Sequence, residues 1–138
     1  MTDLDLARRA MACKHWRWTD GMRATRDHLS TPRHAVRISQ SCNIHQCPDS
    51  GGPWVKTDDN GQWKPERDLL PDLTDPATLG CLLALVREAW ASPLAQVSPM
   101  LPQGGWVCYP NNTEERYGLY FRGETEAAAL VAALEAAP

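Results

Sequence analysis

One stretch decides most of the fold: Leu70-Pro-Asp-Leu-Thr-Asp-Pro-Ala-Thr-Leu-Gly-Cys-Leu-Leu-Ala-Leu-Val-Arg-Glu-Ala-Trp90. Thr74 or Asp75 can cap a helix here with a side-chain oxygen, and Pro76 suits the first helical position because it has no N–H to leave unpaired. Apolar residues then recur at helical spacing on one broad face: Leu79, Leu82, Leu83, Val86 and Trp90. Ser92-Pro93 ends the pattern, since proline restricts the residue before it. The stretch predicts a long helix with its apolar face in the core.

Two shorter helices are predicted near the two ends of the sequence. Thr2 and Asp5 have the spacing of a capping box, so a helix should begin there and end near Cys13. Thr125 can cap a second helix, whose apolar face consists of Leu130, Val131 and Leu134. Asp20-Gly21 between these helices is a turn signal.

The remaining segments predict strands. Residues 34–39 alternate and contain β-branched side chains, which favours a strand. Trp54–Thr57 and Gln62–Lys64 flank an Asn-Gly turn signal and predict a hairpin. Trp106–Tyr109 and Arg116–Phe121 predict a second one. The fold class is therefore α+β: a small antiparallel sheet of two hairpin-like units packed with about three helices.

The length of 138 residues predicts a single domain, 1–138. It should contain a long irregular loop near 40–53 and a proline- and glycine-rich irregular connection at 91–105. No basic and apolar leader and no apolar run of membrane-spanning length is visible, so we expect a cytoplasmic protein without a membrane partner. Thiols in that compartment are reduced, and Cys81 and Cys108 fall in apolar patterns typical of buried packing residues.

Four segments resemble one group of proteins. They are Asp5-Leu-Ala-Arg-Arg-Ala10, the aromatic stretch Cys13–Trp18, the helix entry Leu70–Gly80, and Thr125-Glu-Ala-Ala-Ala-Leu-Val-Ala-Ala-Leu-Glu-Ala-Ala137. Together they resemble small accessory proteins encoded by bacteriophages and prophages. The resemblance implies a protein made in the cytosol of a host cell, and it carries no catalytic residues over. Residues 25–63 lie outside it.

Charge and aromatic residues point to one candidate binding site. Residues 1–40 hold eight Lys/Arg against four Asp, a net charge of +4, and the rest carries six against thirteen, a net charge of −7. In a strand, Trp16 and Trp18 would share one face. Indole rings can stack on a base while arginines hold a phosphate. The candidate ligand-binding residues are Lys14, Trp16, Arg17, Trp18 and Arg23. The alternatives are that the two tryptophans belong to the core and that the basic residues are simply solvated.

Cysteines and histidines give a candidate metal site. Cys42, His45 and Cys47 lie within six residues, and His34 is a fourth zinc-competent side chain. A second paired knuckle is missing, so free cysteines in a loop are the alternative. An endonuclease of the His-Asn-His type would use His34, Asn43 and His45, but Asn43 and His45 are too close together for that motif. No paired carboxylates or phosphate-binding glycine loop accompany these residues, so no catalytic residue is predicted.

These observations lead to a functional expectation. The chain is expected to be a non-enzymatic phage-encoded binding protein, a counter-defence or host-takeover factor. It would either sequester a small nucleotide signal, at a homo-oligomer interface, or block a host defence protein. No cofactor is required for either activity. The alternative is a zinc-binding protein that binds nucleic acid or resembles a nuclease.

Overall fold

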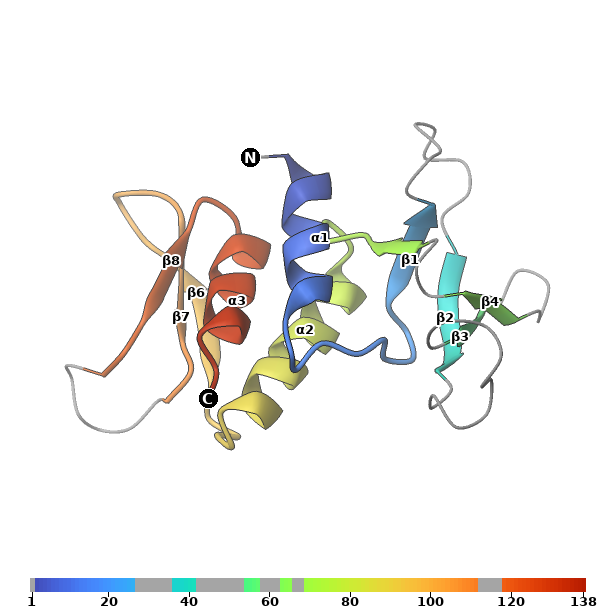
Figure 1. Cartoon of the computed structure of the whole chain (residues 1–138). Coiled ribbons are helices and arrows are strands. Elements are labelled where there is room, and N and C mark those ends of the chain that lie inside the picture. The colour runs from blue at the N-terminus through green and yellow to red at the C-terminus, as the bar shows by residue number, and fades with distance from the viewer. Residues whose placement is uncertain (1, 27–35, 42–53, 58–62, 66–68, 112–117) are drawn as a thin grey trace. The chain divides into compact units, whose positions relative to one another are not determined.

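The computed structural model describes residues 2–26, 36–41, 54–57, 63–65, 69–111 and 118–138 (Figure 1). The chain divides into two compact units. The terminal unit consists of Met1–Arg17 and Leu79–Pro138, and the central unit consists of Trp18–Thr78. The single domain expected for residues 1–138 stays a prediction.

The first helix of the terminal unit is α1 (Asp3–Ala12). Its N-terminus has the predicted capping box: the Thr2 hydroxyl accepts from the Asp5 N–H, and the Asp5 carboxylate accepts from the Thr2 N–H. Cys13 is the residue that ends the helix. Both predicted boundaries of this helix are confirmed.

The last helix of the terminal unit is α3 (Glu126–Glu135), which packs against α1. The Thr125 hydroxyl accepts a hydrogen bond from the Ala128 N–H and caps the helix, as predicted. Leu130, Val131 and Leu134 are buried. The apolar face expected from their spacing is therefore a core face.

The long helix is α2 (Pro76–Ala89). Asp75 caps it, because its carboxylate accepts from the Thr78 N–H at 2.9 Å, and Pro76 occupies the first helical position. The most deeply buried side chains of the helix are Leu82, Leu85 and Val86. Leu79, Leu83 and Trp90 of the predicted face are half-buried.

The end of α2 differs from the expectation that Ser92-Pro93 stops the helix. Ala91 has a φ of 49°, in the left-handed region. The Ser92 N–H donates to the Arg87 carbonyl at 2.8 Å, and the Ala91 N–H donates to the Glu88 carbonyl at 3.0 Å. These two bonds form a Schellman motif, which reverses the chain before the proline is reached.

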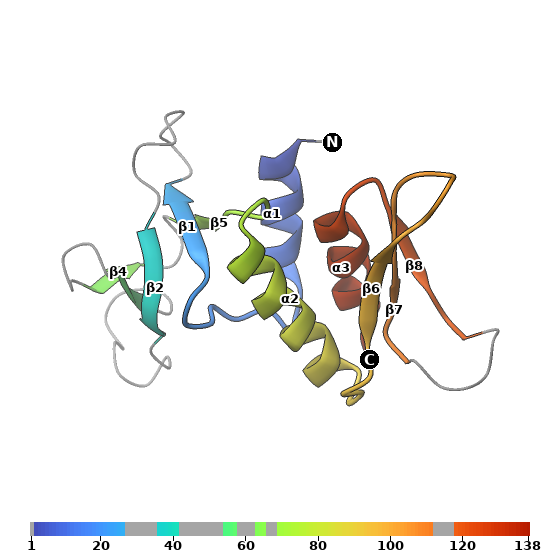
Figure 2. The same cartoon turned by 180° about the vertical axis from the view of Figure 1, so that it is seen from behind.

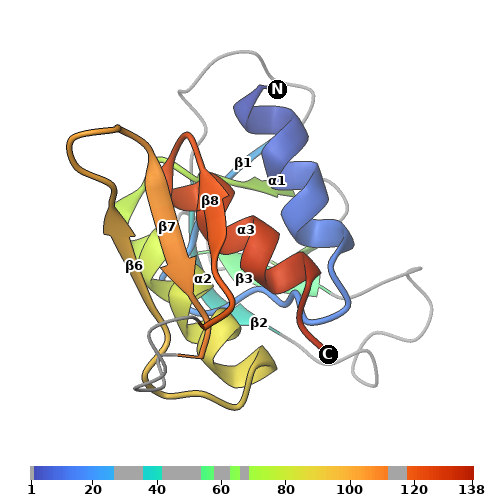
Figure 3. The ribbon, with the colours of Figure 1, turned by 90° about the vertical axis from the view of Figure 1, so that its left-hand side faces the viewer.

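The terminal unit also contains a three-stranded antiparallel sheet in the order β6 (Gln96–Pro99), β7 (Trp106–Tyr109) and β8 (Phe121–Gly123) (Figure 3). Helix α3 packs on one face of this sheet. Phe121 shares that face with Gly123, and its ring lies 6.0 Å from the ring of Trp90. The Trp90 indole N–H in turn donates to the Ala133 carbonyl of α3 at 2.8 Å.

The central unit is built on a five-stranded antiparallel sheet, in which Figure 2 shows β1 beside β2. Its order is β4 (Trp63–Pro65), β3 (Trp54–Thr57), β2 (Val36–Ser41), β1 (Arg23–Arg26) and β5 (Leu69–Pro71). Met22, Ile38 and Leu69 are buried in this unit. The predicted turn lies at Gly21, whose φ of 95° favours glycine.

The α+β class is confirmed, and so are the strand at 36–39 and the pairing of Trp54–Thr57 with residues 63–64. The interpretation of 91–105 as irregular throughout is wrong, because Gln96–Pro99 pairs with β7. The second hairpin pairs β7 with a strand that begins at Phe121. Strands β1 and β5 were not expected from the sequence. The predicted loop at 40–53 falls on residues 42–53, which lie outside the described residues, while residues 40 and 41 belong to β2.

Candidate functional site

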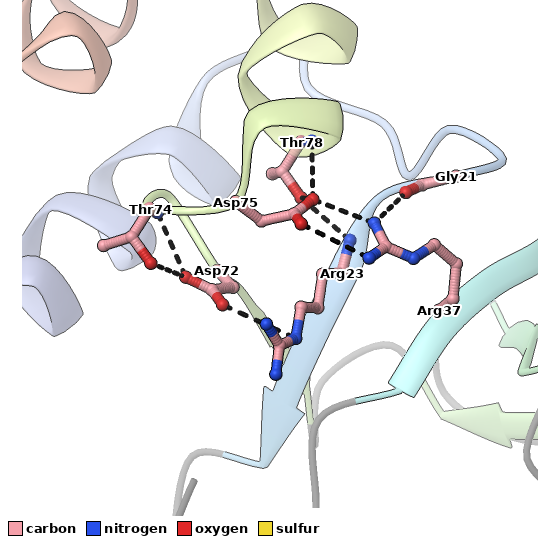
Figure 4. Close-up of polar contacts among 7 residues, drawn as sticks. All are labelled: Gly21, Arg23, Arg37, Asp72, Thr74, Asp75 and Thr78. Atoms are coloured by element: carbon pink, nitrogen blue, oxygen red, sulfur yellow. Dashed lines mark hydrogen bonds and ion pairs between the residues drawn. The ribbon is translucent and has the colours of Figure 1, made fainter.

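The central unit holds a polar cluster at the start of α2 (Figure 4). The Arg37 guanidinium donates to both carboxylate oxygens of Asp75, at 2.9 and 3.3 Å, and to the Gly21 carbonyl at 2.8 Å. The Thr78 hydroxyl also donates to Asp75, and it accepts from the Arg23 N–H at 2.8 Å. Burial raises the pKa of Asp75, but the hydrogen bonds from Arg37 and Thr78 outweigh it and hold that pKa below its ordinary value. The cluster fixes the helix start to strands β1 and β2.

Arg23, a predicted ligand-binding residue, lies beside this cluster. Its guanidinium is 3.7 Å from the Asp72 carboxylate, whose other oxygen accepts from the N–H and hydroxyl of Thr74. Both arginines therefore face carboxylates of the same unit. This arrangement neutralises positive charge that a phosphate would need.

The arginines at the start of the terminal unit are paired in the same way. Arg17 makes two parallel hydrogen bonds to the Glu88 carboxylate, at 2.8 and 2.6 Å, and these bonds lower the pKa of Glu88. Arg9 makes a second bidentate pair with Glu135, at 2.8 and 2.7 Å. Both pairs are well exposed. The arginines of the basic first third are thus engaged with acidic groups of the chain wherever their side chains are described.

The tryptophans do not form the predicted stacking platform. Residues 14–18 are not a strand, so the strand alternation that would place Trp16 and Trp18 on one face does not apply to them. Trp18 is 2% exposed and is a core residue of the central unit, which leaves neither ring face open to a base. Lys14 is exposed and Trp16 is half-buried, both in the terminal unit. The alternative that the tryptophans serve the core is correct for Trp18.

The candidate zinc ligands Cys42, His45, Cys47 and His34 all lie outside the described residues, as does Asn43, so the zinc site stays a prediction. Within the described part of the chain, no group of three His, Cys, Asp or Glu side chains is placed to hold a metal ion. Burial raises the pKa of the Cys13 thiol, and it raises the pKa of Cys108 to about 11. Neither thiol is therefore prepared as a nucleophile near neutral pH.

A group of residues that the sequence reasoning missed lies on the second face of the β6–β7–β8 sheet. Tyr109 and Tyr120 have ring centroids 6.2 Å apart, and the Arg122 guanidinium lies 5.2 Å from the centroid of Tyr120. An open hollow of about 500 Å³ adjoins Tyr109 and Arg122. We call this surface, formed by Tyr109, Tyr120, Arg122 and the hollow, the outer face. Its only sequence signal is the two-residue spacing of Tyr120 and Arg122 about Phe121.

None of the described helices is both long enough and apolar enough to cross a lipid bilayer. Comparison of the chain with protein-family models, with curated proteins and with solved structures found no match.

Proposed function

We propose that this chain is a small phage-encoded protein that acts by binding a host protein and blocking it, without catalysis. The observation that carries the proposal is the outer face, an exposed surface with apolar and aromatic side chains. Leu101, which lines the hollow, is 82% exposed, and Tyr120 is 48% exposed. Exposed apolar surface of this kind commonly marks a protein interaction site, and Tyr, Met and Arg are enriched in interface cores.

The pairing of the arginines argues for this branch over sequestration of a nucleotide. Arg17 and Arg23 face carboxylates, and Trp18 is buried, so three of the five residues expected to hold base and phosphate are engaged by the chain's own groups. A nucleotide carries several negative charges and is usually held by several unpaired donors. A protein that blocks another protein does not need to form a homo-oligomer. The homo-oligomer expected from the sequence stays a prediction.

The test is reconstitution of an inhibited complex from purified components. The tagged full chain is expressed in a bacterial host, and each co-purified protein is then produced separately and mixed with it. We expect one host protein to form a stoichiometric complex, to lose its own activity, and to keep its intact mass. A chemically altered partner would show that the chain is an enzyme. Failure of every candidate to form a complex, with intact nucleotide recovered from the denatured chain, would support sequestration instead.

A further inference from the structure

Arg122 differs from the other arginines whose side chains are described. Arg8, Arg9, Arg17, Arg23 and Arg37 each have a carboxylate within ion-pair distance. Arg87 donates to the Ala95 carbonyl at 3.0 Å. Arg122 has neither kind of acceptor among the described residues, and its guanidinium instead lies over the Tyr120 ring. A guanidinium held against an aromatic face keeps its donors available to a carboxylate from outside.

The residues that line the adjacent hollow offer contacts to both apolar and polar side chains of another protein. Pro99, Met100 and Leu101 supply apolar surface, while Ser98 and Gln103 supply hydrogen-bonding groups. Among the described residues that line it none is acidic, and the formal charge that they carry is the positive charge of Arg122. Two neighbouring hollows that Arg122 also lines contain Glu124, and one of them also contains Asp3. Of these three hollows, that of the outer face is the one with no acidic group among its described lining residues, so its charge is complementary to an anionic group.

The position of this hollow follows from the sheet. Val107 pairs with Arg122 and Ser98 pairs with Val107, so these residues form a row on the face opposite Phe121 and Gly123. Helix α3 covers the other face, and Figure 3 looks onto the strands with α3 behind them. The described part of the chain leaves Leu101 and Tyr120 exposed beside the row.

We propose that the outer face binds a peptide segment of the partner protein in which an Asp or Glu side chain stands next to an apolar one. The carboxylate accepts two hydrogen bonds from Arg122, and the apolar side chain enters the hollow against Met100 and Leu101. This inference rests on the proposed function and specifies the surface and the chemistry of that binding. One guanidinium matches one carboxylate, whereas a nucleotide would place more than one negative charge against it.

The binding specificity is tested with a displayed library of random peptides, selected on the purified full chain. We expect the selected sequences to be enriched in Asp or Glu beside Leu, Ile, Phe or Met. A synthetic peptide of the best sequence should bind measurably by calorimetry, and its version with Gln in place of the acidic residue should bind roughly tenfold more weakly, the loss of about 1.4 kcal/mol expected for a charge-assisted bond. Recovery of no binding peptide, or of binders without an acidic residue, would overturn the proposal.

The surface is tested with matched variants of exposed residues. Arg122→Gln and Leu101→Asp should each weaken the peptide by roughly tenfold or more. Arg8→Gln is the control, because Arg8 is an exposed arginine of α1 that does not line the hollow. Arg122 and Leu101 are both exposed, so substitution of either residue should leave the fold intact. Circular dichroism checks that the variants fold. Equal binding by Arg122→Gln and the parent, or equal loss in the Arg8→Gln control, contradicts the assignment.

Two further arms separate this proposal from its alternatives. ATP and AMP are titrated against the same variants, and nucleotide binding that depends on Arg122 would assign the outer face to a nucleotide and overturn the peptide. The reconstituted host complex is then formed with Arg122→Gln. If that complex forms as tightly as with the parent chain, the proposed function stands and the outer face is not its binding surface. If no host complex forms with either chain, the proposed function itself fails.

Discussion

Gly123 lets α3 lie directly on strand β8. A Cβ atom added to Gly123 would lie 2.4 Å from the Ala129 backbone nitrogen and 2.6 Å from the Ala128 Cβ. Backbone atoms cannot move aside as a flexible side chain can, so the close approach of helix and strand depends on the missing side chain. Arg122, the residue before Gly123, points to the opposite face of the sheet because successive side chains alternate along a strand.

Replacement of Gly123 by alanine should destabilise the protein. Forced overpacking of this kind costs about 1–3 kcal/mol, and chemical denaturation followed by circular dichroism measures it. Gly80→Ala is the control, because Gly80 lies on an exposed face of α2 and a Cβ atom there would have no neighbouring atom within 4 Å. That change should stabilise by about 0.5–1 kcal/mol, since alanine is the better helix former. Similar values for the two variants would mean that α3 does not approach β8 as closely as described.

At the scale of elements, the helices were predictable and several strands were not. Thr2, Asp75 and Thr125 signal helix starts through local chemistry that needs no distant partner. Strands β5 and β6 are short, contain proline, and lie at the edges of their sheets, where proline is tolerated. Strand β1 is Arg-Ala-Thr-Arg and has no apolar alternation. Such strands form because adjacent strands of the sheet supply their hydrogen-bonding partners, and the local sequence pattern does not identify those partners.

The C-terminus of α2 gives a prediction at the same scale. Ala91 bears the steric strain of a left-handed conformation that glycine adopts readily. Ala91→Gly should therefore raise the free energy of unfolding by about 0.5–1 kcal/mol, measured by denaturation. The comparison variant is Ala84→Gly, at an exposed position inside the same helix, which should lower it by about 1 kcal/mol. A loss of stability at both positions would contradict the Schellman motif.

The candidate site was less predictable than the fold for a related reason. The sequence drew attention to the dense stretch Lys14–Trp18, whose aromatic and basic residues are adjacent in the chain. In the structure Trp18 is buried and Arg17 meets Glu88, seventy-one residues away. The outer face, by contrast, joins Tyr109 to Tyr120 and Arg122, which come together only when β7 pairs with β8. Neither the pairing of Arg17 with Glu88 nor the outer face has a local sequence pattern from which it could be predicted.

For the whole molecule, the uneven charge along the chain becomes a set of ion pairs between its first 40 residues and the rest. Arg9 pairs with Glu135, Arg17 with Glu88 and Arg37 with Asp75. The first two pairs are exposed and contribute little each, about 0–1 kcal/mol. Asp75 is 9% exposed and also caps α2, so its carboxylate should matter most.

The dependence of the free energy of unfolding on pH, at acid pH, should show that the Asp75 carboxylate contributes more than the exposed ion pairs. The pKa values of Asp75 and Glu88 are lowered in the folded chain. The folded state therefore binds fewer protons than the unfolded state near the ordinary carboxyl pKa of about 4, so the stabilisation is fully present above that pH and is lost as the pH falls through the folded values. We expect the free energy of unfolding to fall between about pH 5 and about pH 3.

Asp75→Asn keeps a side chain that can cap the helix but removes the titration, so its curve should be flatter than the parent's. Glu88→Gln should flatten the curve less, because solvent screens the exposed pair. Urea denaturation at each pH measures all three curves, and an Asp75→Asn curve parallel to the parent's would show that Asp75 is not held ionised by Arg37 and Thr78.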